Sequence, residues 1–243
     1  MNLLKKNCTG MAIAFLVLMM AILTACGSDE ATPTQPTSEA PIPTLTTQMD
    51  FEETSQTAFL GDNLYITEIG EYSGSYMEDG SNEIVSNVLM LILKNEGTKD
   101  LQFARINLVY SDFTANFEVT NLPAGESVVL LEKNRHAFVS DSYLQAKAEN
   151  VVFFQETMNL KESQVKITGG KNQITVENIG DKTLGKIYVY YKNSATDLFY
   201  GGITYRVSID EGLQPGKTTT VPTNHYYEGA CTILHVDILE LSE

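Results

Sequence analysis

From residue 51 onward, apolar and polar positions alternate in short runs that are separated by Gly, Asn, Asp and Pro. These runs are rich in β-branched and aromatic residues, which is typical of β-strands. One short helix is predicted near residues 140–149, where Ser140 or Asp141 could cap it. The predicted strands are 63–69, 84–94, 101–110, 113–119, 127–131, 151–155, 164–168, 173–178, 184–192, 203–209, 218–221 and 232–241.

Two stretches of this region carry the same sequence pattern. Residues 95–101 read N-E-G-T-K-D-L and residues 178–184 read N-I-G-D-K-T-L, and an alternating run that ends in Tyr follows each. Further on, L-P-A-G at 122–125 corresponds to L-Q-P-G at 213–216. The offset is 83 residues at the Asn and 91 at the Gly, which fits two divergent copies of one domain.

The shared motifs predict chain reversals between antiparallel strands. Asn and Gly tolerate positive φ, so N-x-G is expected to turn the chain, and the Leu that follows is expected to enter the core. In the second motif Pro fixes φ and Gly permits the reversal. Strand, turn and strand would then recur at the same places in both copies.

On these motifs the chain resembles bacterial Ig-like adhesion modules and CARDB-like β-sandwiches. The resemblance implies an all-β fold with two tandem Ig-like antiparallel β-sandwich domains, residues 51–160 and 161–243. It also implies interaction roles at the cell surface and no catalytic residues. The chain has no Trp, so the Cys-Trp-Cys core of antibody domains is excluded.

The strand predicted at 84–94 is apolar on both faces. Ile84, Val88 and Met90 lie on one face, and Leu89 and Leu91 lie on the other. Such a strand needs cover on both sides. One interpretation is a central strand covered by the N-terminal segment or the short helix, and the other is an interface with the second domain or with another chain.

The N-terminus is predicted to be a targeting signal. Lys5 and Lys6 precede an apolar run at 11–25 that is too short to cross a bilayer comfortably and ends in Leu-Thr-Ala-Cys. This ending resembles the lipobox of a bacterial lipoprotein signal peptide. The resemblance implies cleavage between Ala25 and Cys26 and diacylation of the Cys26 sulfur with palmitate-type chains; the alternative is an ordinary secretory signal with a chance Cys.

Residues 26–50 are predicted to be a disordered tether. Pro33, Pro36, Pro41 and Pro43 lie among Thr, Ser, Gln and Ala without apolar periodicity. Such a segment favours extended conformations with a reach of at most about 70 Å. It would hold the folded part away from a membrane to which several acyl chains on Cys26 attach the protein lastingly.

The charge excludes one class of partner. The chain has 16 basic and 31 acidic residues, and removal of residues 1–25 takes two lysines and no acid, which leaves a net charge of −17. Nucleic acid is not an expected partner, because binding phosphates requires a basic surface. After cleavage Cys231 would have no disulfide partner within the chain, so it is interpreted as a small buried residue, with a reactive thiol as the alternative.

No metal site or cofactor is predicted. His136 and His225 occupy matched positions after the Gly turns and are interpreted as making a shared loop hydrogen bond, while His235 lies beside Asp237 in the last strand. Neither H-x-x-x-H nor H-x-H spacing occurs. The loop at 78–83 offers oxygen ligands for Ca²⁺ but lacks the spacing of an EF-hand, and is interpreted as a solvated turn.

Tyrosines gather in the second copy. Tyr188 and Tyr190 share a strand face, and Tyr226 and Tyr227 lie in a later loop. Tyr is favoured at binding surfaces, so these four residues are the predicted ligand surface. The alternative is a cross-strand ladder or core packing.

Catalytic motifs are lacking. The sequence contains neither G-x-S-x-G nor a nucleotide-binding Gly-rich motif, and no motif places a pair of carboxylates. The predicted function is therefore that of an extracytoplasmic, lipid-anchored, non-enzymatic binding or adhesion module for an envelope protein or glycan. The alternatives are a structural spacer or accessory subunit and, more remotely, a hydrolase without a recognisable motif.

Overall fold

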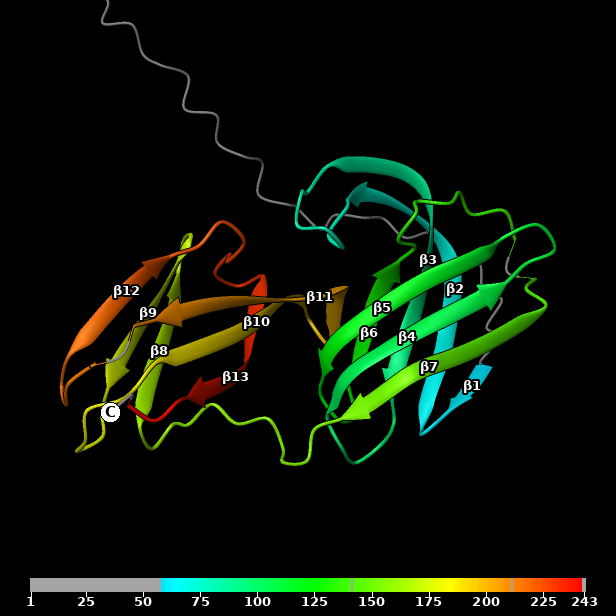
Figure 1. Ribbon diagram of the computed structural model, residues 1–243. Coiled ribbons are helices and arrows are strands. Elements are labelled where there is room, and N and C mark those ends of the chain that lie inside the picture. The colour runs from blue at the N-terminus through cyan, green and yellow to red at the C-terminus, as the bar shows by residue number, and fades with distance from the viewer. Residues whose placement is uncertain (1–57, 141, 211, 242–243) are drawn as a thin grey trace, which may run out of the picture. The chain divides into compact units, whose positions relative to one another are not determined.

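The computed structural model describes residues 58–140, 142–210 and 212–241, and every regular element in these ranges is a β-strand (Figure 1). The all-β prediction is thus confirmed for this part of the chain. Within it, no helix is long and apolar enough to cross a membrane. The signal peptide, Ala25, Cys26 and the tether at 26–50 lie outside the described residues.

The strands are β1 (Ala58–Gly61), β2 (Leu64–Ser75), β3 (Ile84–Asn95), β4 (Leu101–Val109), β5 (Thr114–Leu122), β6 (Ser127–Leu131), β7 (Gln145–Phe153), β8 (Val165–Gly170), β9 (Gln173–Asn178), β10 (Ile187–Ala195), β11 (Leu198–Ile209), β12 (Thr218–Pro222) and β13 (Cys231–Ile238).

The predicted helix near residues 140–149 is wrong. The chain there leads into β7, which pairs antiparallel with β4. Ala146, Val151 and Phe153 of β7 pack against the neighbouring core, so tertiary packing overrides a weak helical preference. Residue 141 is not among the described residues.

The strands form three sheets. A seven-stranded sheet has the order β1-β2-β3-β6-β11-β10-β13, and two three-stranded sheets have the orders β5-β4-β7 and β12-β9-β8. All pairings are antiparallel except the one between β6 and β11, where Phe199 pairs with Val128 and Tyr200 with Val129. This short parallel contact joins strands from the two halves of the chain into one sheet, and all described residues belong to one compact unit.

Each three-stranded sheet packs against a different part of the long sheet. One apolar cluster lies between β5-β4-β7 and the β2-β3-β6 part, with Phe117, Leu91 and Leu130 fully buried in it. A second lies between β12-β9-β8 and the β11-β10-β13 part, with Val176 and Val189 fully buried. The chain therefore forms two successive sandwich-like packings, each of a three-stranded sheet on part of the long sheet.

The strand order of one half recurs in the other. In the first half β3 is flanked by β2 and β6, and β4 is flanked by β5 and β7; in the second half β9 is flanked by β8 and β12, and β10 by β11 and β13. The six strands of one set therefore correspond in chain order to the six of the other, and β1 is additional.

The repeated N-x-G motif is built around a buried Asn side chain. Asn95 Nδ2 donates to the carbonyl oxygens of Lys99, at 3.0 Å, and Leu122, at 3.2 Å, and its Oδ1 accepts from the N–H of Gly97. Its backbone pairs with the second motif, because the N–H of Gly125 donates to the Asn95 carbonyl oxygen. The side chain thus ties together two loops that are some 27 residues apart in sequence.

The second N-x-G motif has the same contacts. Asn178 Nδ2 donates to the carbonyl oxygens of Lys182, at 2.8 Å, and Leu213, at 2.7 Å, and its Oδ1 accepts from the N–H of Gly180. The N–H of Gly216 again donates to the Asn carbonyl oxygen. Both Asn residues are fully buried.

The predicted physics of this motif is corrected in one respect. Neither Asn95 nor Asn178 has positive φ, so backbone freedom is not why Asn is needed there. Asn serves through its amide, which satisfies buried carbonyl groups. Positive φ does occur at Gly125, with φ 81°, and at Gly216, with φ 71°, where the predicted Gly reversal is confirmed.

β3, the strand predicted to be apolar on both faces, is covered on its outer face by the residues that follow β2 and by β11. Met90 and Val88 of β3 are buried there together with Tyr76 and Met77, which follow β2. Tyr200 of β11 packs against the same cluster. The interpretation of this face as a contact with the second half is therefore supported, whereas residues 51–57, which could also cover it, lie outside the described ranges.

Candidate functional site

The predicted tyrosine surface begins on the outer face of β10. Ile187, Val189 and Tyr191 point into the core, and Tyr188 and Tyr190 alternate with them and are partly exposed. The predicted sharing of one face by Tyr188 and Tyr190 thus agrees with the strand's alternation.

Basic side chains lie over the first of these rings. The Arg206 guanidinium is 4.7 Å from the centre of the Tyr188 ring, and the Lys186 ammonium is 5.7 Å from it. Arg206 comes from β11, where it pairs across the sheet with Tyr190. The face therefore combines aromatic rings with two cations, which hold the Tyr188 ring by cation–π attraction.

The second ring adjoins a histidine of β13. The His235 ring is tilted against Tyr190 at 5.8 Å between ring centres, its Nδ1 accepts from the backbone N–H of Asn159 at 2.9 Å, and its Nε2 lies 2.7 Å from an Asp237 oxygen. Because Nδ1 accepts, the hydrogen is on Nε2, which donates to Asp237. The Nδ1 bond holds the segment between β7 and β8 against β13, and the Nε2 bond, which stays within β13, fixes the orientation of the ring.

The surroundings of the Tyr190 hydroxyl change its pKa. Burial raises the pKa of Tyr190 above its ordinary value, and the Asp237 carboxylate raises it further. Tyr190 is therefore a neutral donor at physiological pH.

The other two predicted residues lie elsewhere. Tyr226 is buried, with 6% of its surface exposed, and contacts Tyr191 edge-on in the second core. A Cβ at Gly169 would clash with the Tyr226 ring, so this ring fills space that a glycine leaves open. Tyr227 is half-buried, and its N–H donates to the Cys231 sulfur at 3.4 Å. Tyr226 belongs to the core, and only Tyr188 and Tyr190 lie together on the outer face of the sheet.

Cys231 is a free thiol enclosed by the same loop. Its sulfur lies 3.3 Å from Asn193 Oδ1 and 3.4 Å from the His225 carbonyl oxygen, and its single S–H can donate to either of them. Burial raises the pKa of the Cys231 thiol to about 11. Little thiolate is therefore present at neutral pH, which agrees with a packing role.

Each of the two matched histidines packs against an aromatic ring of its own half, and the loop hydrogen bond predicted to be common to both is not found among the described residues. His136 lies 4.6 Å from Phe113, which stacks on Tyr110 at 4.7 Å. His225 lies 4.6 Å from Tyr205, which stacks on Tyr191 at 5.4 Å. Their backbone bonds differ, since the His136 N–H donates to Glu132 and the His225 carbonyl oxygen accepts from Cys231.

The polar loop at 78–83 is tied to the protein by ion pairs and hydrogen bonds. Arg135 contacts Asp79 at 3.0 Å and Glu83 at 2.7 Å. The described residues contain no group of three or more His, Cys, Asp or Glu side chains that could hold a metal ion.

A buried lysine, not identified from the sequence, lies where the two halves meet. Lys192 is fully buried, and its ammonium donates to the carbonyl oxygens of Gly201, Gly202 and Ile203 at 2.7–2.9 Å. The pairing of β10 with β11 jumps from Tyr191–Tyr205 to Asn193–Tyr200, so residues 201–204 bulge out opposite Lys192. The bulge frees three carbonyl groups from the ladder, and the ammonium has three N–H donors for them.

Glu78 of the first half binds the same bulge. Its carboxylate accepts from the N–H of Leu131 at 2.8 Å and from the N–H of Gly202 at 2.7 Å. Burial raises the pKa of Glu78, and burial likewise lowers the pKa of Lys192. The attraction between Glu78 and Lys192 opposes both shifts, so each charge supports the other around the Gly202 peptide.

Further polar contacts hold the bulge against β5. Thr120 Oγ1 donates to the Gly202 carbonyl oxygen at 2.9 Å, and Thr204 Oγ1 donates to the Thr120 carbonyl oxygen at 3.1 Å. A Cβ at Gly202 would clash with the Glu118 carbonyl oxygen, so only glycine permits this approach. We call Glu78, Lys192, Gly202, Thr120 and Thr204 the inter-half network.

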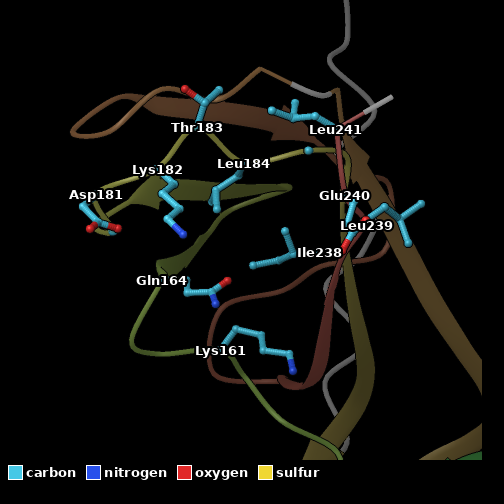
Figure 2. Close-up of a pocket in the computed structure, with 12 residues that line it drawn as sticks. Lys161, Gln164, Asp181, Lys182, Thr183, Leu184, Ile238, Leu239, Glu240 and Leu241 are labelled. Atoms are coloured by element: carbon cyan, nitrogen blue, oxygen red, sulfur yellow. The ribbon is translucent and has the colours of Figure 1, made fainter. Parts of the chain in front are cut away.

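A depression of about 480 Å³ lies at one end of the second half (Figure 2). Gln164, Lys182 and Ile238 project toward its centre, and Leu239 and Leu241 line one side. None of the four predicted tyrosines lines it.

Comparison with known proteins gives no relative: the chain matches no family model, no curated protein and no solved structure.

Proposed function

We propose that this chain is a lipid-anchored, extracytoplasmic, non-catalytic binding module made of two copies of an Ig-like β-sandwich. The support for two copies is the repeated strand order together with the matched Asn95 and Asn178 contacts. The domain bounds of this proposal are 51–160 and 161–243, which meet between β7 and β8.

The support for membrane attachment is the lipobox-like ending of the apolar run before Cys26. The Pro- and Thr-rich segment after it would act as the tether. In this arrangement the chain is bound to the outer face of the cell membrane by acyl chains on Cys26.

The lipid anchor is tested by metabolic labelling with a palmitate analogue. Wild-type protein is expected to take up the label and Cys26→Ser to take up none, because the thiol is the acylated group. Cys231→Ser serves as the matched control and keeps the label. An unlabelled wild type would contradict the anchor.

The observation that carries the binding role is the Tyr188–Tyr190 face. Its two partly exposed rings, with Arg206 beside them, offer an apolar platform and charged donors on the outer face of β10. Aromatic rings flanked by polar groups suit the stacking of a sugar ring or the burial of a protein side chain. The proposed partner is an envelope glycan or an envelope protein.

This role is tested by retention of the full chain on purified bacterial cell-wall glycan and on solubilised envelope protein. The Tyr188→Ala/Tyr190→Ala variant is expected to lose about tenfold or more in affinity, since aromatic anchors dominate such contacts. Phe59→Ala, which removes an exposed ring of the first half, is the control and retains affinity. Unchanged retention, or a double variant that no longer folds, would contradict the proposal.

A spacer or accessory role is the second candidate, and the inter-half network favours it. The N–H of Gly202, in the second half, donates to Glu78 of the first half, and the carbonyl oxygen of Gly202 accepts from Lys192. These contacts would fix the two halves to each other. A rigid body on a tether could position another envelope component. A stable stoichiometric protein complex that survives Tyr188→Ala/Tyr190→Ala would favour this role.

A further inference from the structure

The two copies differ at one sheet edge. In the first half β1 adds to the edge of β2, where Ala58 pairs with Ile66 and Phe59 with Tyr65. Ala58 and Leu60 pack on the first core, while Phe59 is 62% exposed. A short strand with apolar residues at alternate positions thus closes this edge.

The corresponding edge of the second half is that of β8. Val165 pairs with Asn178 as Leu64 pairs with Asn95, so Val165, Lys166 and Ile167 correspond to Leu64, Tyr65 and Ile66. These are the β8 residues that a counterpart of β1 would cover. In the described part of the chain β8 pairs as a strand on one side only, with β9. On its other side the N–H of Val165 donates to the Lys161 carbonyl oxygen, and the strand is open beyond this residue.

The segment before β8 goes to the opposite sheet. Asn159 accepts from the N–H of Val236 of β13 at 2.9 Å, and its own N–H donates to His235. The chain therefore does not supply β8 with the strand that β2 receives.

An apolar groove of about 300 Å³ lies along this edge. Leu160, Val165, Ile167, Ile179 and Ile233 supply its apolar lining. Ile179 is 48% exposed there, and Glu162 and Lys166 complete the wall.

We propose that the β8 edge binds an extended segment of a partner protein by strand addition, with apolar side chains at alternate positions entering the groove. The first half supplies the template, because β1 makes these contacts at the corresponding edge. A second copy of the chain is not the occupant, since two bodies of net charge −15 or more negative repel each other. The inference rests on the proposed binding role and specifies that the partner is a protein with an extended segment of alternating apolar residues.

The test uses a phage-displayed random peptide library against the full chain in detergent. Selected peptides are expected to carry apolar residues at alternate positions and to slow hydrogen exchange at the amides of Ile167 and Gly169, which face away from β9. Ile179→Asp is expected to weaken the binding of a selected peptide at least tenfold, and Ile179→Ser to weaken it less. Leu239→Asp changes a side chain of similar exposure, 49%, outside the groove and is expected to leave affinity within twofold.

The inference would be overturned by selected peptides that protect other strands, by equal effects of Ile179→Asp and Leu239→Asp, or by a dimer in sedimentation whose β8 amides are already protected without peptide. Retention on glycan through Tyr188 and Tyr190 does not involve this edge. If no peptide that protects β8 can be selected while glycan retention is intact, strand addition is contradicted and the proposed function is not.

Discussion

Replacing Lys192 with Met is expected to lower the free energy of unfolding by about 3–5 kcal/mol, the usual cost of removing one member of a buried charged pair. The change leaves the carbonyl groups of Gly201, Gly202 and Ile203 without their donor. It also leaves the Glu78 carboxylate without its nearby positive charge. Urea unfolding followed by circular dichroism measures the loss.

The partner substitution separates charge from hydrogen bonding. Glu78→Gln is expected to cost roughly 1–3 kcal/mol, because the amide nitrogen cannot accept from a backbone N–H. The double variant Glu78→Gln/Lys192→Met is expected to lose less free energy of unfolding than the two single variants lose together, by about 1–3 kcal/mol. Strict additivity would contradict coupling between Glu78 and Lys192.

The pH dependence follows from the lowered pKa of Lys192. The unfolded chain keeps this proton up to the ordinary lysine value, whereas the folded chain releases it at lower pH. Between those two values the unfolded state binds more protons, so the contribution of Lys192 to stability rises with pH. Glu78→Gln removes the charge that opposes this shift, so the pKa of Lys192 falls further below its wild-type value of about 7. It also removes a carboxyl group whose raised pKa, about 7, makes wild-type stability fall as pH rises above the ordinary Glu value. The free energy of unfolding of Glu78→Gln relative to wild type, measured by urea unfolding, is therefore expected to rise between about pH 5 and pH 7.

Asn95→Ala and Asn178→Ala are expected to destabilise the protein by similar amounts, roughly 3 kcal/mol each. Each change removes a buried side-chain donor: the Leu122 carbonyl oxygen loses its bond from Asn95, and the Leu213 carbonyl oxygen keeps only the Leu184 N–H. Asn→Asp at either position is expected to cost at least as much, since a carboxylate cannot donate to those carbonyl groups. Urea midpoints of the variants give the comparison.

Asn224→Ala is the matched control. Asn224 is exposed, and its replacement is expected to change stability by less than about 0.5 kcal/mol. A large effect of Asn95→Ala alone, with Asn178→Ala close to the control, would show that the two motifs do not serve the same purpose.

Much of the strand pattern could be predicted from alternation and turn residues. The bounds of β6 and β9 agree with the predicted 127–131 and 173–178, because each strand has a sharp turn at its ends. The first part of β11 was not predicted, since Gly201 and Gly202 interrupt the apolar pattern there. β1 was not predicted either, because four residues are too few to show a period.

The inter-half network could not be predicted. Strict alternation after Tyr191 places Lys192 on the outer face of β10, where a lysine is expected to be exposed. It is buried because the bulge in β11 surrounds its ammonium group with carbonyl oxygens. Glu78 lies in a stretch of polar residues that is typical of a solvated turn. A bulge depends on contacts between distant strands, so no local signal marks it. For the same reason Tyr226 was expected on a surface, although the space over Gly169 places it in the core.

The central claim is that two matching halves are held as one cooperative body. Hydrogen exchange measured in increasing urea tests it most directly, with β4 (Leu101–Val109) reporting on the first half and β9 (Gln173–Asn178) on the second. We expect the amides of both strands to lose protection at one common midpoint, because the β6–β11 pairing and the inter-half network break together. Two separate midpoints would contradict the claim.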